Sequence, residues 1–354
     1  MNFPNGRVLL IGRLDGTRGP LGVAKALHTR LAKMHDCQTD EAFTFADVLR
    51  RIVKIPFAYK GYSICVHQNG FRIPLILCLL SKIDHCNTYY LVVHGIAAEE
   101  RKYRPVLNRD LRIESKLIKE FPNLICVSEF ERHRLFHLYG EREGVCVIHN
   151  GVDALEGLII ERNILDDSAL LNPIFITTGG FEQRKAVDLA LSMLTQLTKL
   201  GYKPKLVVCG RDSVETGSNR ALCEDIARDG GIDLVYEGEI KDKKRLWLLY
   251  SQAHFYIGLS RFDTFNVSVL EGAAAGCVPI VSTTCGVAEL FDEASAFLVD
   301  VDDCDAVRGL TDNIAATLND GSEYSKLSVA AREVARISTW DRAARQYWRI
   351  LSHE

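Results

Sequence analysis

Residues 255–282 read FYIGLSRFDTFNVSVLEGAAAGCVPIVS, and they carry the main fold signals of the chain. An apolar, strand-like run at 255–259 leads into a polar loop at 261–266, and a helical pattern begins at Val267. Thr264 or Asn266 is expected to cap this helix, and Gly276 suits its end. A second apolar run follows at 278–281. Strand, loop, helix and strand in this order predict a parallel sheet with helices on its faces.

The same alternation occupies most of the chain, and it occurs as two sets. Apolar runs lie at 8–11, 63–66, 89–93, 124–127 and 145–148, and then at 174–177, 205–209, 234–236, 255–259 and 278–281. Helical patterns lie between them, with regular apolar faces at 23–33 and 186–199. Two sets predict two doubly wound domains that bind ligand in the cleft between them, at the carboxyl ends of the strands.

The domain boundary is expected near the sequence NGVD at 150–153, with the polar stretch 156–172 as a linker. We therefore predict a first domain over 1–151 and a second domain over 152–335. The remaining residues, 336–354, contain an amphipathic helix pattern with aromatic residues on one face.

Composition favours a cytoplasmic globular protein. The chain has 354 residues, of which 47% are hydrophobic and 25% are charged. Its longest apolar run, 73–80, is too short to span a bilayer, and the N-terminus shows no signal-peptide pattern. The 11 cysteines form no C-x-x-C pair, so they indicate reduced thiols rather than zinc sites or disulfides.

Charge is divided unevenly along the sequence. Residues 1–150 carry a net charge of +7 and the rest carry −10. The basic half either meets an anionic partner or is simply a solvated surface. This half contains a basic run that consists of Arg101, Lys102, Arg104, Arg109, Arg112, Lys116 and Lys119. The run is either a solvated helix face or a surface that contacts an anionic membrane or a phosphate-bearing acceptor. No aromatic–basic motif accompanies it, so we expect no nucleic-acid partner.

Two carboxylates in the opening stretch are candidates for ligand binding. Asp263 lies in the loop after a strand, and Glu271 lies one turn into the helix that follows. One can accept hydrogen bonds from a sugar and the other from ribose hydroxyls, while the free amides at the helix start suit a phosphate. Acids at this spacing are also common on solvated surfaces, and the spacing alone does not decide between the two.

A pair of cations lies in the turn after the apolar run 174–177. Arg184 and Lys185 follow a double glycine and precede a helix. Because cations are unfavourable at a helix N-terminus, two of them there indicate an anion, and fixed cations stabilise the charge of a departing diphosphate. The alternative is a basic helix end exposed on the surface.

Several segments, taken in order, resemble the retaining glycosyltransferases of family 4. They are VSE at 127–129, NGVD at 150–153, GGFEQRK at 179–185, LVVCG at 206–210, YEGEI at 236–240, the D-x7-E region at 263–271 and STTCGVAE at 282–289. The resemblance covers most of residues 90–350, and the first ninety residues match loosely. It implies an α/β GT-B fold, in which two Rossmann-like domains face a cleft and the C-terminal helix crosses back to the first domain.

The resemblance also implies roles for individual residues. The donor diphosphate would lie on Arg184, Lys185 and the helix start at Val267, the ribose on Glu271, and the base near Ile240. The donor sugar would lie between Asp263, His94 and the backbone of Thr264, Phe265 and Asn266. Glycines of the first loop, Gly19 and Gly22, would approach the nucleotide sugar, although a plain tight turn explains this loop equally well.

Some residues depart from the family pattern or stay open. Asp263 stands where most members have Glu, and Gly180 stands where many have Arg. His94 is either a donor-sugar contact or a satisfied, partly buried histidine. Glu289 either contacts ligand or has a structural role. The pair His133 and His137 lacks the glutamate of a metalloprotease helix and is interpreted as surface residues.

The resemblance implies a retaining hexosyltransferase-like enzyme that needs no metal or other cofactor. It would move a sugar from a nucleotide-sugar donor to a saccharide or lipid-linked saccharide in cell-surface polysaccharide or glycoconjugate synthesis. Peripheral contact with the inner face of the membrane, through the basic first domain, is expected with it. The alternatives are an inactive scaffold subunit, suggested by Gly180 and Asp263, and a transferase acting on a small soluble acceptor. A dehydrogenase is disfavoured because the sequence has no G-x-G-x-x-G fingerprint.

Overall fold

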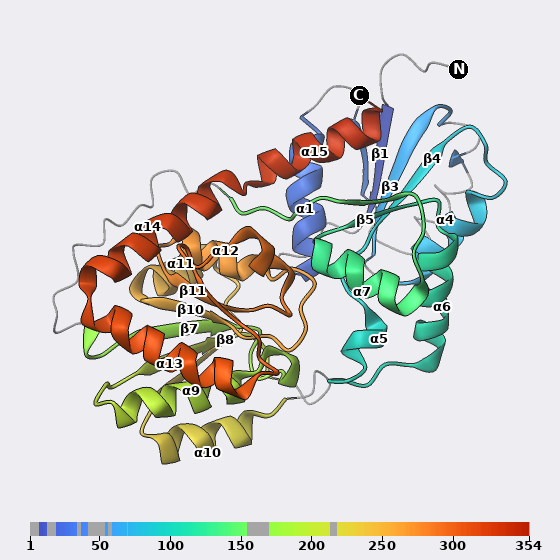
Figure 1. Ribbon diagram of the computed structural model, residues 1–354. Helices are drawn as coiled ribbons and strands as arrows, with labels where there is room; N and C mark the ends of the chain where they lie inside the picture. The colour runs from blue at the N-terminus through green and yellow to red at the C-terminus, as the bar shows by residue number, and fades with distance from the viewer. Residues whose placement is uncertain are drawn as a thin grey trace. The chain divides into compact units, whose positions relative to one another are not determined.

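The computed structural model describes residues 7–12, 19–33, 37–41, 54–55, 59–68, 70–153, 170–212 and 218–353 (Figure 1). The contacts divide the chain into two compact units. The first comprises Met1–Ala98, Val106–Gly151 and Thr339–Glu354, and the second comprises Glu99–Pro105 and Val152–Ser338. Most of the expected linker lies outside the described residues, which resume at 170.

The first unit is built on a parallel sheet. Its described strands are β1 (Arg7–Gly12), β2 (Cys37–Glu41), β3 (Tyr62–His67), β4 (Thr88–Val92), β5 (Asn123–Cys126) and β6 (Val145–Val147). They are ordered β2-β1-β3-β4-β5-β6, and every pairing is parallel. The strands β3 and β4 are buried almost throughout, as expected for a sheet with helices on both faces.

Helices cover this sheet, and one of them comes from the C-terminal end of the chain. The described helices are α1 (Gly19–Leu31), α4 (Arg72–Leu80), α5 (Ala97–Glu100), α6 (Asn108–Glu120), α7 (Glu129–Tyr139) and α15 (Trp340–Ser352). Thr339 caps α15 by accepting a hydrogen bond from the amide of Arg342. The buried face of α15 packs on α1, β1 and β3, so the last helix belongs to the core of the first unit (Figure 1).

The second unit has a parallel sheet of the doubly wound type. Its strands are β7 (Ile174–Thr178), β8 (Lys205–Cys209), β9 (Asp233–Gly238), β10 (Phe255–Gly258), β11 (Val278–Ser282) and β12 (Phe297–Val299). The order is β12-β11-β10-β7-β8-β9, with all pairings parallel. Strand order reverses between the neighbours β7 and β10, and in such sheets ligands bind outside the carboxyl ends at this switch point.

Helices lie on both faces of the second sheet. They are η1 (Gln183–Lys185), α9 (Val187–Lys199), α10 (Arg220–Gly230), α11 (Lys243–Gln252), α12 (Val267–Ala274), η3 (Gly286–Leu290), α13 (Cys304–Asn319) and α14 (Gly321–Ile337). Figure 1 shows α9 and α10 on one side of the strands and α11 and α12 on the other. The predicted α/β architecture of two parallel-sheet domains is confirmed. Among the described helices, none combines the length and the hydropathy needed to cross a membrane.

Candidate functional site

The turn after β7 is shaped by a close approach of two backbone segments. Gly180 has φ of 64°, and a Cβ atom there would lie 1.8 Å from the carbonyl oxygen of Arg211. The amides of Gly179 and Gly180 both donate to the Cys209 carbonyl at 2.9 Å. Position 180 therefore has no room for the arginine that many family 4 enzymes place there, and the cations of this turn come from η1 instead.

These cations converge on the carboxylate predicted in the opening stretch. Lys185 Nζ lies 2.6 Å from Asp263 Oδ2, and Arg184 Nη1 lies 3.0 Å from the same oxygen. The other oxygen, Oδ1, accepts from the amide of Phe265 at 3.2 Å. Asp263 is only 8% exposed, and the three side chains follow the neighbouring strands β7 and β10. The cluster thus lies at the switch point of the second sheet.

Asp263 and Arg184 keep their charge at neutral pH. Burial raises the pKa of Asp263, but Lys185 and Arg184 more than offset this, so the pKa lies well below its ordinary value. Burial lowers the pKa of Arg184, and Asp263 and Glu182 more than reverse that effect. The sequence pattern of two cations predicted an anion beside them, and Asp263 supplies one such anion.

The loop that carries Asp263 is held by the segment after β11. The Asp263 amide donates to the carbonyl of Thr284 at 3.1 Å, and the Asp263 carbonyl accepts from the Gly286 amide at 3.0 Å. The Val287 amide donates to the carbonyl of Phe265 at 2.9 Å. The turn that resembles the family's S-x-x-G-G-x-x-E segment therefore braces the site, whereas Glu289 lies exposed on η3.

Helix α12 begins directly after this loop with an unusual residue. Its N-cap is Asn266, which has φ of 69° and ψ of 73° and makes no side-chain capping bond. Asn266 is therefore the N-cap, one of the two residues predicted for this position, but it takes a left-handed conformation and its side chain does not make the expected capping bond. Amides at the start of α12 stay without the cap that Ser, Thr, Asp or Asn usually provides.

Glu271 lies one turn into α12, where it meets a residue that sequence reasoning missed. The hydroxyl of Tyr250, on α11, donates to Glu271 Oε2 at 3.3 Å. Tyr250 is 1% exposed, whereas Glu271 is partly exposed. In the sequence, Tyr250 looks like an ordinary residue of a helix that packs on the sheet, because only the fold brings its hydroxyl to Glu271.

His94 belongs to a cluster of histidines in the first unit. Its Nε2 lies 2.8 Å from Nδ1 of His67, and the two rings stack with centroids 5.1 Å apart. His28 lies beside His67, with a centroid separation of 5.5 Å. Burial lowers the pKa of His94 to about 3, so the ring is neutral at pH 7. Sequence reasoning did not identify His67 or His28, because only the fold brings them to His94.

The other predicted residues fall into both units. Thr264 and Phe265 are buried in the loop before α12, and Val267 is the partly exposed first residue of that helix. Ile240 is buried just after β9. Gly19 and Gly22 lie in the first turn of α1, and residues 13–18 of the preceding loop lie outside the described residues.

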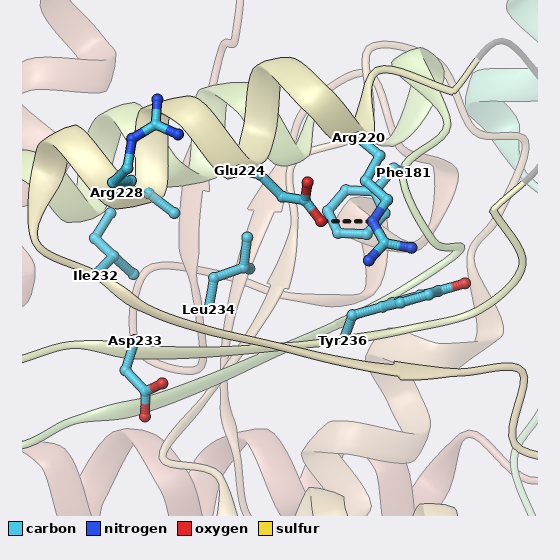
Figure 2. A pocket seen from close by; sticks show the side chains of 9 residues that line it. Phe181, Arg220, Glu224, Arg228, Ile232, Asp233, Leu234 and Tyr236 are labelled. Atoms are coloured by element: carbon cyan, nitrogen blue, oxygen red, sulfur yellow. Dashed lines mark hydrogen bonds and ion pairs between the residues drawn. The ribbon is translucent and has the colours of Figure 1, made fainter.

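A cavity of about 590 Å³ lies away from these residues, between α10 and β9 (Figure 2). The Arg220 guanidinium lies 4.6 Å from the ring centroid of Tyr236 and 5.7 Å from that of Phe181. It also pairs with Glu224 at 2.7 Å, as Figure 2 shows. None of the predicted site residues lines this cavity, so it is distinct from the cluster around Asp263. Among the described residues, no group of three or more His, Cys, Asp or Glu could hold a metal ion.

Comparison with known proteins points to the same part of the chain. Residues 166–334 match the family model described as "Glycosyl transferases group 1". The chain is 26% identical over 136 residues to a GDP-mannose:cellobiosyl-diphosphopolyprenol alpha-mannosyltransferase of Xanthomonas oryzae, covering 38% of this chain and 34% of that protein. It is 24% identical over 182 residues to a glycogen synthase of Xanthomonas euvesicatoria, covering 51% of this chain and 34% of the relative. The matched region thus spans about a third of each of these two relatives.

Solved structures match almost the whole chain. Sucrose-phosphate synthase from Thermosynechococcus elongatus superposes with a TM-score of 0.75 at 17% identity, covering 98% of both chains. HepE from Anabaena, in complex with UDP and glucose, gives 0.71 at 14% identity, covering 99% of this chain and all of the other. The chain therefore has the GT-B fold of these proteins. The resemblance to group 1 glycosyltransferases is supported for residues 166–334.

Proposed function

We propose that this protein is a retaining glycosyltransferase of family 4. It transfers a sugar from a nucleotide-sugar donor to a saccharide or lipid-linked saccharide acceptor, in the synthesis of a cell-surface polysaccharide or glycoconjugate. The proposal extends the match of residues 166–334 to an activity of the whole chain.

One observation carries the proposal. Two partly buried cations, Arg184 and Lys185, contact the loop that leads into α12, at the switch point of the second sheet, and the N-cap of α12 makes no side-chain capping bond. Both features attract phosphate. A diphosphate at this place would bring the nucleoside toward Glu271 and Ile240, and the sugar toward the backbone of residues 264–266.

The proposed chemistry is charge stabilisation. When the glycosidic bond breaks, negative charge gathers on the departing diphosphate, and fixed cations stabilise it without reorganisation. Arg184 and Lys185 fill this role in the proposal. In the family, retention is thought to occur by front-face attack assisted by the leaving phosphate, so no protein nucleophile and no metal is required. We expect transfer to persist in excess EDTA.

Asp263 and His94 are the proposed contacts of the donor sugar. Both oxygens of Asp263 already accept hydrogen bonds, so a sugar hydroxyl would share the carboxylate with Lys185 and Arg184. A carboxylate has about four lone-pair sites, which allows such sharing. His94 would act as a neutral imidazole that exchanges a hydrogen bond with a hydroxyl.

Donor binding is tested first, by thermal shift. Nucleoside diphosphates and nucleotide sugars are screened, beginning with GDP-mannose, which the Xanthomonas relative's name specifies, and UDP-glucose. A ligand present at 100 times its dissociation constant adds about 2.7 kcal/mol of stability. If no compound raises the melting temperature, the donor site as proposed does not exist.

Transfer is tested with a charge deletion. Lys185→Ala is expected to lower kcat at least a hundredfold, because loss of one donor to a developing anion costs about 10²–10³ in rate. Lys199→Ala is the matched control, since Lys199 lies exposed at the end of α9 and pairs with Gln196. Equal rates for the two variants would remove Lys185 from the mechanism.

The acceptor side is proposed to include an anionic membrane surface. Arg109, Arg112, Lys116 and Lys119 are exposed on α6 at intervals of three or four residues, so they form one basic stripe. At low salt, the protein is expected to sediment with vesicles that contain phosphatidylglycerol and to stay in the supernatant with neutral vesicles. Replacing the four residues by Gln should abolish the difference.

The alternative of an inactive scaffold subunit is distinguished by donor hydrolysis. An enzyme releases nucleoside diphosphate slowly from its donor in the absence of acceptor. A protein that binds the donor but releases none, with or without saccharide acceptors, would be a binding subunit.

A further inference from the structure

A set of buried hydroxyl groups lies beneath α12 in the second unit. Tyr250, on α11, donates to Glu271 Oε2, as described above. Tyr256, on β10, exchanges a hydrogen bond with Thr178 Oγ1 at 2.7 Å. Glu271 and Thr178, the residue before the double glycine, are thus each bonded to a buried tyrosine hydroxyl.

Packing holds the tyrosines in place. The rings of Tyr250 and Tyr256 meet edge to face, with centroids 6.0 Å apart, and both residues are at most 1% exposed. Tyr250 is also fixed through its backbone, because its carbonyl accepts from Cys277 Sγ at 3.1 Å. A buried aromatic ring has a single orientation, so its hydroxyl marks a fixed point against which a flexible side chain can be oriented.

A fixed hydrogen-bond donor beside Glu271 would increase its affinity for ribose. Its side chain has three rotatable bonds, and ordering it on ligand binding costs affinity. The Tyr250 hydroxyl is fixed by burial and donates to Glu271 Oε2 at 3.3 Å, so it restricts the side chain before ligand arrives. A carboxylate has about four lone-pair sites, so the bond from Tyr250 is compatible with hydrogen bonds from ribose hydroxyls.

We propose that Tyr250 is a positioning residue that orients the carboxylate of Glu271 for the ribose of the nucleotide. This inference rests on the proposed function, because it assumes that Glu271 meets a ribose. Tyr250 itself would not touch the ligand, since it is buried beneath Glu271.

The test compares ligands that differ in the ribose. Binding of GDP and UDP, of their 2′,3′-dideoxy analogues and of inorganic pyrophosphate is measured by titration calorimetry with wild type and Tyr250→Phe. The substitution removes one atom and leaves the ring packing. We expect the better-binding ribonucleotide to bind about tenfold more weakly to the variant, the scale of one hydrogen bond to a charged group. Affinities for the dideoxy analogue and for pyrophosphate should stay unchanged.

Two further variants separate positioning from general damage. Tyr202→Phe removes another buried hydroxyl of the second unit, bonded to Asn319 at 2.8 Å, and should leave all three affinities unchanged. Glu271→Gln should weaken ribonucleotide binding, and adding Tyr250→Phe to it should weaken binding little further, because the two residues act as one unit.

The outcomes separate the inference from the proposed function. If Tyr250→Phe binds the ribonucleotide as tightly as wild type, or loses affinity for pyrophosphate equally, the positioning role is refuted while the donor site stands. If wild type binds neither GDP nor UDP, the proposed function is refuted, and with it the premise of the inference.

Discussion

Asp263 neutralises part of the charge that its own site presents to a ligand. It accepts from Lys185 and Arg184 through one oxygen, and Glu182 lies 3.4 Å from Arg184. Two carboxylates thus accompany two cations. A diphosphate bound as proposed would compete with a protein anion that already accepts hydrogen bonds from both cations.

Asp263→Asn is therefore expected to change stability and anion affinity in opposite directions. Without ligand, the variant should melt at a lower temperature, because two partly buried cations lose a charged partner. Pyrophosphate should bind this variant about tenfold more tightly. The neutral amide no longer repels an anion that binds to Lys185 and Arg184. Calorimetry and thermal melting measure both effects.

Asp188→Asn provides the control for this prediction. Asp188 pairs at 2.6 Å with Arg261, a cation other than Lys185 and Arg184, in the same unit. Its variant should lose stability without gaining pyrophosphate affinity. Weaker pyrophosphate binding to Asp263→Asn would show that the carboxylate positions the cations more than it opposes the ligand.

At the scale of the element, α12 packs closely on β10 because Gly272 has no side chain. A Cβ atom at Gly272 would lie 2.8–3.0 Å from atoms of Tyr256, so only glycine lets the helix rest directly on β10. This close contact places Glu271 beside Tyr250. Glycine inside a helix costs about 1 kcal/mol relative to alanine, and here the packing outweighs that cost.

Two glycine-to-alanine variants should therefore differ in sign. Gly272→Ala is expected to lower the free energy of unfolding by about 1–3 kcal/mol through overpacking against Tyr256. Gly309→Ala, within α13, should raise it by about 0.5–1 kcal/mol, because nothing lies within 4 Å of its Cβ position. Urea denaturation measures both values. A stabilised Gly272→Ala variant would mean that α12 can move away from the sheet without cost.

The sequence pattern predicts elements well where local signals suffice. The start of α12 at Val267 and the strands β7, β8, β10 and β11 follow from apolar runs bounded by turn residues. The conformation of Asn266 does not follow, since the tertiary contacts of the loop impose it. The contacts Lys185–Asp263, Tyr250–Glu271 and His67–His94 join residues 78, 21 and 27 positions apart, so no periodicity could reveal them.

At the scale of the whole molecule, buried histidines make stability depend on pH. His28 and His67 are 1% and 3% exposed, and His28 has no hydrogen-bond partner among the described residues. Burial lowers the pKa of His28 to about 4 and that of His94 to about 3. Burial, and secondarily His94 and His28, lowers the pKa of His67 well below its ordinary value.

We expect the protein to lose stability as pH falls from 6.5 toward 4. In this window the histidines bind protons in the unfolded chain but not in the folded protein. Their contribution to the free energy of unfolding is therefore complete above pH 6.5 and declines below it. Melting temperatures across this range measure the slope. His28→Leu should flatten it, and His133→Leu, at an exposed position on α7, should not. An unchanged slope in His28→Leu would place the acid sensitivity elsewhere.

The path of the chain out of the first unit and back has a practical consequence. A Cβ atom at Gly151 would lie 2.3 Å from Thr339, and the Val152 amide donates to the Ser338 carbonyl at 2.9 Å. Apart from the short segment Glu99–Pro105, the chain leaves and re-enters the first unit at nearly one point, so residues 152–338 resemble a cassette whose two ends touch. Joining Gly151 directly to Thr339 would excise that cassette and leave α15 attached to the sheet on which it packs. The same junction could receive the corresponding segment of another protein with the GT-B fold, while the first unit keeps its own covalent frame.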